Sequence, residues 1–599
     1  MLLRTITIND IQSSCFDYII IGGGTSGCVL GARLASIPHV SVLLVEAGRD
    51  SGLAPDVLVP GKYVFQLDAD KDGLWELPTV PQRHLNGRVI TFLRGKQMGG
   101  TSAINYMALA RGPAADYDAW ADMVGDDAWR WENILPLMKD LEDFNPQLPS
   151  GFEGYASPRP EHHGKGGPLK VGFGQVMVPG VETFFKACLD AGIPVCLDNN
   201  SGDPVGVGLA QFNVRHGERS YAANAFLPNA RRMDLTNLTV VTNTECDRVV
   251  IKEGKAVGVD LFDKVSSKTA YIACNKEVIV CAGTLATPKV LMLSGIGPKR
   301  LLEKQCIPVQ VDSPGCGQNM LDHTILTTEY EVDDRIPAHN QIFLDHDLLT
   351  AAEAEYAQSR TGPLAMYGSS GSVAFPKIPA MYNSKEFHDL DPSTKDFLLE
   401  ASRPSAEIWL GSGPAAYSGP VGPKDSYITH EMLLQNNLSR GSVVIASKNP
   451  RDLPVIDPNF LSHPFDKRIA IETVRMALKI AQAAAYRGII RRMVHGPNID
   501  VFSAPALAIS DDILLEFIKE NLGQGYHSVG TCKMGRPGEP AAVVDARFKV
   551  IGVENLRVAD LSVCPILTSN HTQINAYLIG EVCARQIIQE EGARRLAKL

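Results

Sequence analysis

Two short hydrophobic runs near the start of the chain are separated by a glycine-rich segment. Asp17-Tyr18-Ile19-Ile20-Ile21 has the continuous apolar pattern of a buried strand, and Val42–Val45 repeats it. Between them, Gly22-Gly23-Gly24-Thr25-Ser26-Gly27 indicates a turn that leads into a helix, and Pro38 indicates where that helix stops. The pattern therefore predicts a strand, a turn, a helix and a second strand within about 30 residues.

This predicted unit has the spacing of a dinucleotide-binding site. Gly22 permits the tight turn, Gly24 lets the backbone approach a pyrophosphate, and Gly27 lets the helix and the strand pack closely. The helix begins at Thr25-Ser26, where unpaired N–H groups favour phosphate charge. Glu46 follows the second strand, at the place where a carboxylate accepts hydrogen bonds from ribose hydroxyls. The unit alone does not distinguish NAD from FAD.

Hydrophobic periodicity predicts further elements but no internal repeat. Leu238–Thr242, Cys246–Lys252 and Ala256–Phe262 alternate apolar and polar positions, which predicts a small antiparallel meander. Other predicted elements are a buried strand at 277–283, a helix at 288–293, a β-like segment at 441–446, a long helix at 466–491, a strand at 556–559 and a last helix at 574–591. Residues 130–220 are expected to be irregular, with His162 and His163 in a solvated loop.

Composition narrows the classes of protein and partner. A chain of 599 residues is too long for one simple core, so two large interleaved domains are expected. The net charge of −10 and the lack of a long basic run argue against nucleic acid or an anionic membrane surface as a partner. No apolar run approaches the ~18 residues of a membrane span, and residues 1–15 lack the apolar region of a secretory signal. The twelve cysteines are scattered without a C-x-x-C, so no metal site is predicted.

The last three residues carry a different signal. Ala597-Lys598-Leu599 is a close variant of the Ser-Lys-Leu peroxisomal address, and basic residues precede it. We therefore expect binding by the peroxisomal import receptor and location in the peroxisome. The alternative interpretation is a charged helix end that finishes in leucine, and the expected location is then the cytoplasm.

A second glycine-rich loop spans residues 94–105 and contains the adjacent Gly99-Gly100. Glycines allow the backbone to lie close against a flat ring or a phosphate. The alternative is a flexible surface loop, but Met98 and Ile104 favour burial.

Three segments together resemble the glucose-methanol-choline (GMC) family of FAD-dependent oxidoreductases. Residues 95–105 match one family signature, and residues 283–297 match the second. Residues 314–323 resemble the family's link between domains. The segments occur in the expected order and cover nearly the whole chain. Within the family, the nearest in character are aryl-alcohol oxidase and choline dehydrogenase-like members, and residues 570–573 look more like the former.

The resemblance implies that FAD, bound non-covalently, occupies the dinucleotide site. Glu46 would bind the adenosine ribose, Val249 would contact the adenine side, and residues 94–105 would line the pyrophosphate and the isoalloxazine. Ile104 stands where some relatives carry the histidine that tethers the flavin. The residues implied as FAD contacts are Gly22, Gly24, Thr25, Ser26, Gly27, Glu46, Arg94, Met98, Gly99, Gly100, Ser102, Asn105, Val249, Ala559, Asp560, Thr572 and Gln573.

The resemblance also implies two catalytic histidines near the end of the chain. Residues 526–535 resemble the family's catalytic segment, and residues 570–573 resemble its second active-site position. Hydride leaves an alcohol carbon more easily when the hydroxyl proton goes to a base, and a neutral imidazole suits that task near neutral pH. We assign His527 as the base and His571 as a hydrogen-bonding partner that stabilises developing alkoxide charge. His323 is interpreted as a packed residue at the domain link.

These assignments predict an FAD-dependent alcohol oxidase or dehydrogenase. It would oxidise a primary or secondary alcohol, aromatic or from secondary metabolism, to a carbonyl, with hydride transfer to flavin N5. One alternative is a non-redox cyclase or dehydratase of a polyketide-like substrate on the same fold, and another is a flavin-binding protein without turnover. No carboxylate lies near either histidine motif to indicate a cationic substrate. The aromatic residues weighed as pocket walls or core are Tyr63, Phe65, Phe92, Tyr367 and Trp409.

The expected fold class is α/β, with an α+β substrate part. A Rossmann-like FAD-binding domain would comprise residues 16–170, 220–325 and 515–599, because the nucleotide fold opens at one end of the chain and finishes at the other. An interleaved substrate-binding domain, built on an antiparallel sheet, would comprise residues 171–219 and 326–514. The expected partners are a small-molecule alcohol, oxygen or another electron acceptor, and a second copy of the chain in a homodimer.

Overall fold

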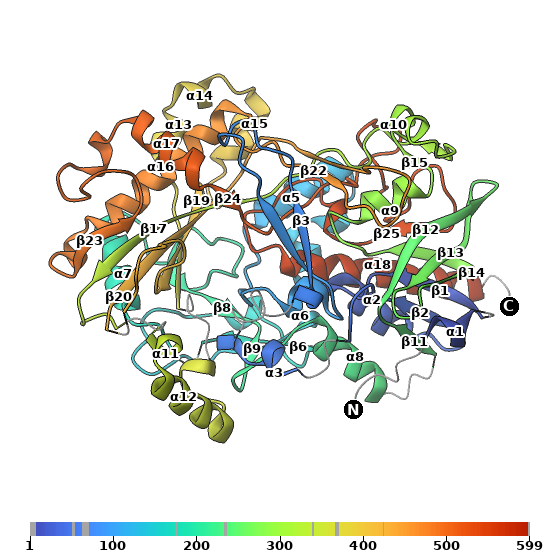
Figure 1. Ribbon diagram of the computed structural model, residues 1–599, viewed down its shortest axis with the longest axis horizontal. Coiled ribbons are helices and arrows are strands. Elements are labelled where there is room, and N and C mark those ends of the chain that lie inside the picture. Colours follow the sequence, from blue (N-terminus) through green and yellow to red (C-terminus); the bar gives the residue numbers. More distant parts are fainter. Residues whose placement is uncertain are drawn as a thin grey trace.

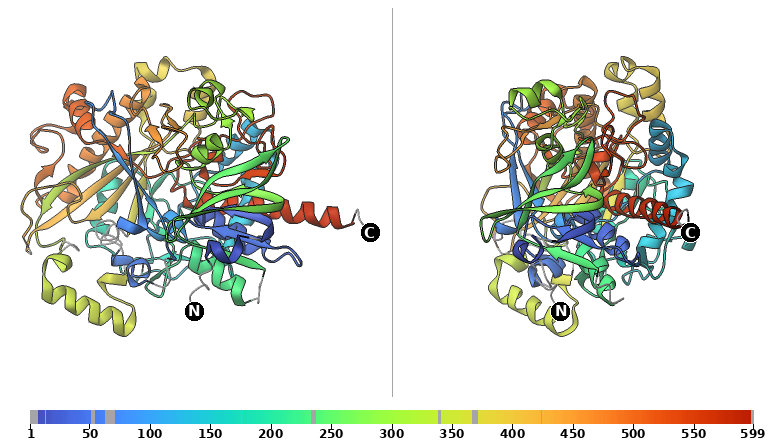
Figure 2. Two further views of the ribbon diagram at one scale, coloured as in Figure 1. Left: turned by 45° about the vertical axis from the view of Figure 1, so that its right-hand side comes forward. Right: turned by 90° about the vertical axis from the view of Figure 1, so that its right-hand side faces the viewer.

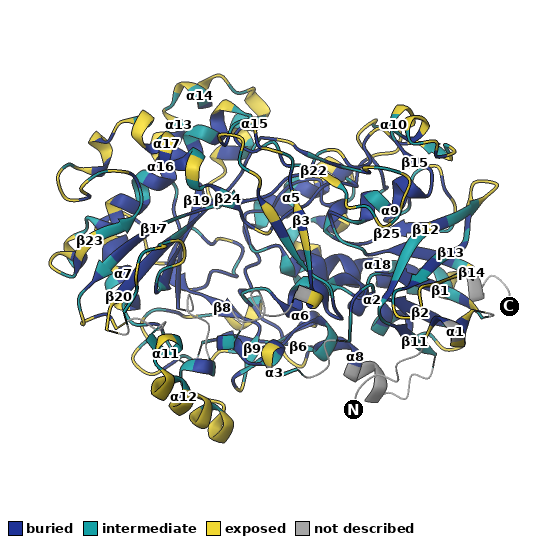
Figure 3. Cartoon of the chain, viewed as in Figure 1, coloured by how far each residue is buried: buried dark blue, intermediate teal, exposed yellow. Residues whose placement is uncertain are grey.

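Two β-sheets stand side by side in the computed structural model and define its two halves (Figure 1). The structure describes residues 7–12, 14–50, 54–62, 71–174, 176–232, 237–337, 341–365, 371–422 and 424–596. Figure 3 shows that the strands of both sheets are largely buried, whereas peripheral helices such as α12 (His346–Ser359) and α14 (Lys385–His388) are exposed on their outer sides.

The first sheet is the nucleotide-binding half. Its strands are β1 (Cys15–Ile21), β2 (Val42–Val45), β11 (Leu238–Val241), β12 (Thr244–Lys252), β13 (Lys255–Asp263), β14 (Lys268–Val280) and β25 (Leu556–Val558). The order is β11-β2-β1-β14-β13-β12, and β25 pairs with β14. Every residue of β2 is buried, as expected for a parallel strand covered on both faces. The helices α2 (Thr25–Leu34) and α18 (Gln573–Leu596) pack against one another beside it.

The predicted meander is only partly correct. Leu238–Val241 pairs in parallel with β2, so it extends the parallel part of the sheet instead of starting the meander. The antiparallel strands are β12, β13 and β14. Alternation of apolar and polar positions indicates a strand but does not specify its partner, which explains the error.

The second sheet is antiparallel. Its strands are β7 (Gly206–Leu209), β17 (Thr324–Val332), β18 (Ser372–Phe375), β19 (Ala406–Ser412), β20 (Ser426–Leu434), β23 (Ile490–His495) and β24 (Gly523–Gln524). Their order is β23-β17-β20-β19-β18-β7, and β24 pairs with β17. The helices α7 (Val181–Asp190), α16 (Pro464–Ala481) and α17 (Asp511–Asn521) pack against this sheet.

Two other sequence predictions were wrong in extent. Residues 130–220 are not irregular throughout: they contain α6 (Trp131–Leu141), α7, and the small sheet of β5 (Glu142–Asn145), β6 (Leu169–Phe173) and β8 (Gln211–Phe212). These short elements are stabilised by pairing between distant segments, which local periodicity does not reveal. The helix predicted at 466–491 ends at Ala481, before the left-handed Gly488 and strand β23.

The predicted fold class is confirmed: the molecule is α/β, with a Rossmann-like mixed sheet and an interleaved domain on an antiparallel sheet. The strands of the first sheet come from residues 15–45, 238–280 and 556–558, so this half is discontinuous. Strand β24 belongs to the second sheet although residues 515–599 were expected in the FAD-binding domain. The domain boundaries themselves stay a prediction.

Smaller elements connect and border the two sheets. Strands β3 (Leu74–Pro78) and β4 (Thr91–Gly95) form a hairpin that leads into residues 95–105. The other elements are α1 (Ile8–Ile11), α3 (Pro55–Leu58), α5 (Ala114–Val124), α8 (Ala222–Arg232), α9 (Thr287–Leu293), α10 (Lys299–Lys304), α11 (Gln341–Leu344), α13 (Pro379–Tyr382), α15 (Pro392–Leu399), β9 (Val214–Arg215), β10 (Glu218–Arg219), β15 (Ile296–Gly297), β16 (Val311–Asp312), β21 (Ser442–Val444) and β22 (Val455–Asp457).

Helix α18 begins beside the first sheet and extends well beyond the body of the molecule (Figure 2). Ala597-Lys598-Leu599 lie outside the described residues. Within the part of the chain that the structure describes, no helix is long and apolar enough to cross a membrane.

Candidate active site

A cavity of about 350 Å³ is lined by residues of both sheets. The first sheet contributes the turn after β1 and the end of β2, and the second sheet contributes side chains of β17, β19 and β20. The candidate histidines His527 and His571 lie on the same cavity as Glu46. The structure therefore joins the predicted cofactor site and the predicted catalytic site in one space.

The dinucleotide end of the cavity is built by the glycine turn. Gly22 has φ +105°, and a Cβ there would lie 2.3 Å from the carbonyl oxygen of Cys281, so only glycine fits. Gly24 is the N-cap of α2 and offers no side chain to the first N–H groups of the helix. Gly22, Gly24, Thr25 and Ser26 all line the cavity. Free N–H groups at a helix start suit a pyrophosphate.

Glu46 lines the cavity at the end of β2. One carboxylate oxygen accepts from the N–H of Gly23 at 2.9 Å, and the other accepts from the N–H of Gly48 at 2.7 Å. Burial raises its pKa to about 7, although these two N–H groups oppose the shift. Each carboxylate oxygen has a second lone pair, so Glu46 retains acceptor capacity for ribose hydroxyls.

The loop after β4 forms another wall. Arg94, Gly100, Ser102 and Asn105 line the cavity. A Cβ on Gly100 would lie 2.8 Å from the Cα of Gly24, so the two glycine-rich segments are in close contact. Only glycine at position 100 permits that approach.

Five predicted cofactor residues do not line the cavity, and four of them hold its walls together. Gly27 packs against the carbonyl oxygen of Gly22, where a Cβ would lie 1.9 Å away. The sulfur of Met98 packs on Gly23, and the N–H of Gly99 donates to the Gly23 carbonyl at 2.7 Å. The N–H of Ala559 donates to the carbonyl of Val280 at 2.9 Å, which ties β25 to β14.

The fifth, Val249, is a correction. Its backbone N–H donates to Ser294 Oγ at 2.8 Å, so it is not available to an adenine. The beginning of β12 lines the cavity instead, at Thr244, Glu245 and Cys246. The error arose because the strand pattern does not show which end of β12 reaches the cavity.

The remaining predicted cofactor residues lie where the strand β25 and helix α18 meet the cavity. Asp560, Thr572 and Gln573 line it. Asp560 Oδ2 accepts from the N–H of Gly283 at 2.9 Å and from Thr287 Oγ1 at 2.6 Å, so this carboxylate also fixes the turn after β14. Taken with the uncapped helix start and the crowded glycines, the residues present fit FAD.

The two candidate catalytic histidines face one another. Their ring centroids are 4.8 Å apart with an interplanar angle of 76°. His527 follows β24, whereas His571 precedes α18, so two separate segments deliver them. The hydrogen bonds of Asp322 position His527: Oδ1 accepts the backbone N–H of His527 at 2.7 Å, and Oδ2 accepts from Ser528 Oγ at 2.8 Å. Arg94 Nη2 also donates to Ser528 Oγ at 2.8 Å.

Sequence reasoning missed the role of His323. This side chain is packed as predicted, with no exposed surface, but its Nδ1 lies 2.9 Å from Nδ1 of His527. The signal in the sequence was its place in the motif at residues 314–323, which was interpreted only as a domain link.

Sequence reasoning also missed Glu407 on β19. Its Oε1 lies 2.5 Å from Nε2 of His571, and its Oε2 accepts from Gln435 Nε2 at 3.0 Å. The indole N–H of Trp409 also donates to Oε1. The expectation that no carboxylate lies near the histidine motifs is therefore wrong in space. No local pattern could have found Glu407, because it is 164 residues away from His571.

The wall beyond the histidines is mainly apolar. Its side chains are Tyr106, Met107, Ala108, Phe212, Ile325, Trp409 and Leu433, with the part-buried carboxylate of Glu431 among them. Of the aromatic residues weighed from sequence, Trp409 lines the cavity, while Phe92 is buried against Phe460 and does not line it. Tyr63, Phe65 and Tyr367 lie outside the described residues.

The pH dependence of the reaction follows from the environment of His527. Burial lowers its pKa well below the ordinary value of 6.5, and the neighbouring His571, His323 and Arg94 oppose a positive charge on its ring and lower the pKa further. A base must be neutral to accept a proton, so we expect activity to persist below pH 6.5 before it falls. The measurement is kcat/KM against pH. An acid limb with a midpoint above 6.5 would contradict the assignment.

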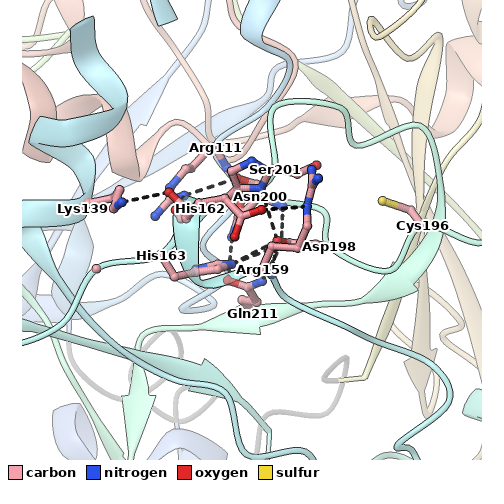
Figure 4. A network of polar contacts seen from close by, with 12 residues as sticks. Arg111, Lys139, Arg159, His162, His163, Cys196, Asp198, Asn200, Ser201 and Gln211 are labelled. Atoms are coloured by element: carbon pink, nitrogen blue, oxygen red, sulfur yellow. Dashed lines mark hydrogen bonds and ion pairs between the residues drawn. The ribbon is translucent and has the colours of Figure 1, made fainter. Parts of the chain in front are cut away.

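A buried polar network that includes Arg111, His163 and Asp198 (Figure 4) contacts the segment that carries His571. Arg111 Nη2 lies 2.6 Å from Glu142 Oε1, and His163 lies between Glu142 and Asp198, with Nε2 3.2 Å from Asp198 Oδ2. The carbonyl of Arg111 accepts from Asn570 Nδ2 at 2.8 Å, directly before His571. The prediction that His162 and His163 form a solvated loop was wrong for His163, which is only 7% exposed.

The charge on His163 is expected to stabilise the fold in a pH-dependent way. Burial lowers the pKa of His163, but hydrogen bonds to Asp198 and Glu142 outweigh it, so the pKa is raised. Its stabilising contribution is therefore complete below about pH 6.5 and is lost as the pH rises through the raised value. We expect His163→Gln to cost about 2 kcal/mol of unfolding free energy at pH 6 and less at pH 9. Denaturant unfolding at the two pH values measures this, and equal losses would contradict it.

No group of three or more histidine, cysteine or acidic side chains that could hold a metal ion occurs among the residues that the structure describes.

Comparisons with known proteins agree with this geometry. A family profile described as GMC oxidoreductase matches residues 16–325, and a second of the same description matches residues 437–580. The chain is 33% identical over 577 residues to the oxygen-dependent choline dehydrogenase of Brucella anthropi, which covers 96% of this chain and 95% of the relative. It is 30% identical over 597 residues to versicolorin B synthase of Aspergillus parasiticus, with 96% and 88% covered.

A solved structure shows the same fold. Pyridoxine 4-oxidase from Mesorbium loti superposes with a TM-score of 0.78 at 27% identity, over 95% of this chain and 99% of that one.

Proposed function

Because this chain belongs to the GMC oxidoreductase family, whose flavin is FAD, we propose that it oxidises a primary or secondary alcohol to a carbonyl compound. The observation that carries the proposal is the arrangement at one end of the cavity. There His527, with a lowered pKa, faces His571, and His571 is paired with the buried carboxylate of Glu407. This gives the site a neutral base and a second imidazole whose Nε2 is fixed by a buried carboxylate.

Bound FAD supplies the hydride acceptor, and the chain supplies its binding and the proton chemistry. The turn at Gly22–Ser26 and Glu46 would hold the nucleotide, and the residues of the loop 94–105 that line the cavity would also contact the cofactor. The substrate hydroxyl donates to Nε2 of His527, which takes that proton as the carbon–hydrogen bond breaks. His571 donates its Nε2–H to Glu407, so its other nitrogen, Nδ1, is the one left to stabilise negative charge on the substrate oxygen when the ring is cationic.

The walls support an uncharged, largely apolar substrate, such as an aromatic alcohol or one from secondary metabolism. Phe212, Ile325, Trp409 and Leu433 offer apolar surface beside the histidines. Burying aromatic or aliphatic substrate surface against them favours binding by roughly 25 cal/mol per Å². Oxygen or another acceptor would then take the electrons.

We propose that the FAD is bound without a covalent link. Ile104 lines the cavity at the position where some relatives carry a histidine that tethers the flavin, and its side chain has no nucleophilic atom. Precipitation of the protein by acid should release the yellow cofactor into the supernatant. Yellow colour that stays with the precipitate would contradict this.

One observation favours a second candidate function. The relative from Aspergillus parasiticus is named a synthase, and paired histidines can also serve acid–base chemistry. A non-redox cyclisation or dehydration of a polyketide-like substrate would use the same pair without electron transfer.

An alcohol panel under anaerobic conditions separates the two functions. The proposal predicts that at least one alcohol bleaches the oxidised-flavin band at about 450 nm, with formation of the carbonyl product. Turnover of a polyketide-like substrate without bleaching, and no bleaching by any alcohol, would support the cyclase instead.

Location and assembly stay proposals. Import into the peroxisome is proposed on the tripeptide Ala597-Lys598-Leu599 and on the extension of α18 away from the body of the molecule (Figure 2). A fluorescent fusion that preserves these three residues should be peroxisomal, and one that lacks them cytoplasmic; the same distribution for both would contradict import by this signal. Light scattering would show whether the chain forms the proposed homodimer.

A further inference from the structure

The contact between His323 and His527 limits where their protons lie. Their Nδ1 atoms are 2.9 Å apart, and the rings are nearly perpendicular, at 84°. A neutral imidazole carries one N–H, and its other nitrogen is an acceptor. A hydrogen bond between the two Nδ1 atoms therefore requires that one of them carries a proton and the other does not.

The direction of this hydrogen bond decides whether His527 can act as a base. If His323 donates, Nδ1 of His527 accepts, its single proton lies on Nε2, and Nε2 has no lone pair for the substrate. If His527 donates, its Nε2 carries the lone pair. Nδ1 of His527 is engaged with His323, and His527 lines the cavity, so its Nε2 is the nitrogen available to a substrate there. Only the second arrangement is compatible with proton abstraction.

Two features of His323 allow this second arrangement during catalysis. Its Nε2 is buried and has no hydrogen-bond partner among the described residues, so no competing group fixes its tautomer. Burial, helped by charge on His571, lowers its pKa to about 3, so it stays neutral when His527 takes a proton. The Nδ1 lone pair of His323 then accepts a charge-assisted hydrogen bond from the His527 imidazolium.

We propose that His323 is a positioning residue for the base: its Nδ1 accepts the Nδ1–H of His527, keeps Nε2 of His527 open to substrate, and stabilises the imidazolium. The inference deepens the proposed function and rests on it. In the step itself, the O–H bond of the alcohol breaks, an N–H bond forms at Nε2 of His527, and the Nδ1–H stays on His527.

An uncharged acceptor has a consequence that a carboxylate would not have. The charged or titratable groups around His527 are Arg94, His323, His571, Tyr526 and Asp322. Asp322 accepts the backbone N–H of His527 and not its ring, so the ring nitrogen faces a neutral partner. A neutral partner orients the base but raises its pKa less than a carboxylate would, so the pKa of His527 stays low.

Two variants of His323 separate positioning from packing. His323→Leu removes the acceptor, and we expect the rate constant of anaerobic flavin reduction to fall roughly 10- to 100-fold with FAD content unchanged. His323→Asp restores an acceptor at the same place, but a charged one. We expect it to recover most of the rate at alkaline pH and to move the acid limb upward by a pH unit or more. His430→Leu, which removes another fully buried histidine, on β20, serves as the control with unchanged kinetics.

A second readout needs no substrate. Protonation of His527 is expected to perturb the absorption spectrum of bound flavin. The part of this pH titration that is lost in His527→Ala then reports on His527. Its midpoint should be higher in His323→Asp than in the wild type. Equal midpoints, or equal rates for wild type and His323→Leu, would overturn the role of His323. Absence of bleaching by any alcohol together with a shifted midpoint would instead place the failure in the proposed function.

Discussion

Replacing His527 by alanine should lower the rate constant of flavin reduction by about 10²- to 10⁴-fold while FAD stays bound. The magnitude is that of losing a general base. His527 lines the same cavity as the Glu46 carboxylate and the glycine turn, but it is not among the residues that we propose to hold FAD. Stopped-flow absorbance measures the reduction, and the ratio of flavin to protein absorbance measures the FAD content.

The outcome that excludes His527 as the base is unimpaired reduction in this variant. Loss of FAD would also contradict the account, because it would give His527 a role in cofactor binding. A control is His162→Ala, which changes a part-exposed histidine of the network in Figure 4 and should leave reduction intact.

Replacing Glu407 by glutamine should lower the rate of flavin reduction about 10²-fold near neutral pH. The amide can still accept a hydrogen bond from His571 Nε2, but it removes the negative charge that lies 2.5 Å from that nitrogen. The rate constant of anaerobic flavin reduction at neutral pH measures the effect.

Glu431→Gln is the matched control for Glu407. This carboxylate lies on the neighbouring strand β20 and lines the same cavity, and in the sheet Glu431 is opposite Trp409 and not opposite Glu407. We expect it to change the KM for some alcohols and to leave the rate constant of reduction at saturating alcohol unaltered. If Glu431→Gln and Glu407→Gln behave alike, the general negative potential of the cavity, and not the contact with His571, carries the effect.

The nucleotide end of the site could be predicted because its determinants are local. Gly22, Gly24 and Glu46 belong to one strand–turn–helix–strand unit, and each role follows from spacing within it. The same holds for Arg94 and Gly100, which lie in one short loop after β4. Local sequence patterns can therefore predict a site whose residues all lie within one short segment.

The proton chemistry could be predicted only in part, because it depends on contacts between distant segments. His527 and His571 were found through resemblance to family motifs. Glu407 and His323 were not, since each is distant in sequence from its histidine: pairing of β24 with β17 brings His527 beside His323, and Glu407 on β19 contacts the segment before α18. Cys246 lines the cavity and Val249 does not, for a related reason. The position of the sheet determines which end of β12 reaches the cavity, and the alternation of apolar and polar residues along the strand does not reveal it.

The network of Arg111, Glu142, His163 and Asp198 illustrates a third limit. Polar residues in a stretch rich in glycine and proline indicate a solvent-exposed loop, and most such stretches are loops of this kind. Here two carboxylates, an arginine and a histidine satisfy one another inside the fold, so the segment can be buried. Composition cannot reveal that compensation in advance.

The central claim is that hydride leaves the carbinol carbon while His527 takes the hydroxyl proton. The most direct test is anaerobic stopped-flow reduction of the enzyme by the best alcohol of the panel and by the same alcohol deuterated at the carbinol carbon. The account predicts bleaching of the flavin at a rate that is clearly slower with the deuterated alcohol, with one carbonyl product formed per flavin reduced. Equal rates with the two alcohols, or product without bleaching, would contradict it.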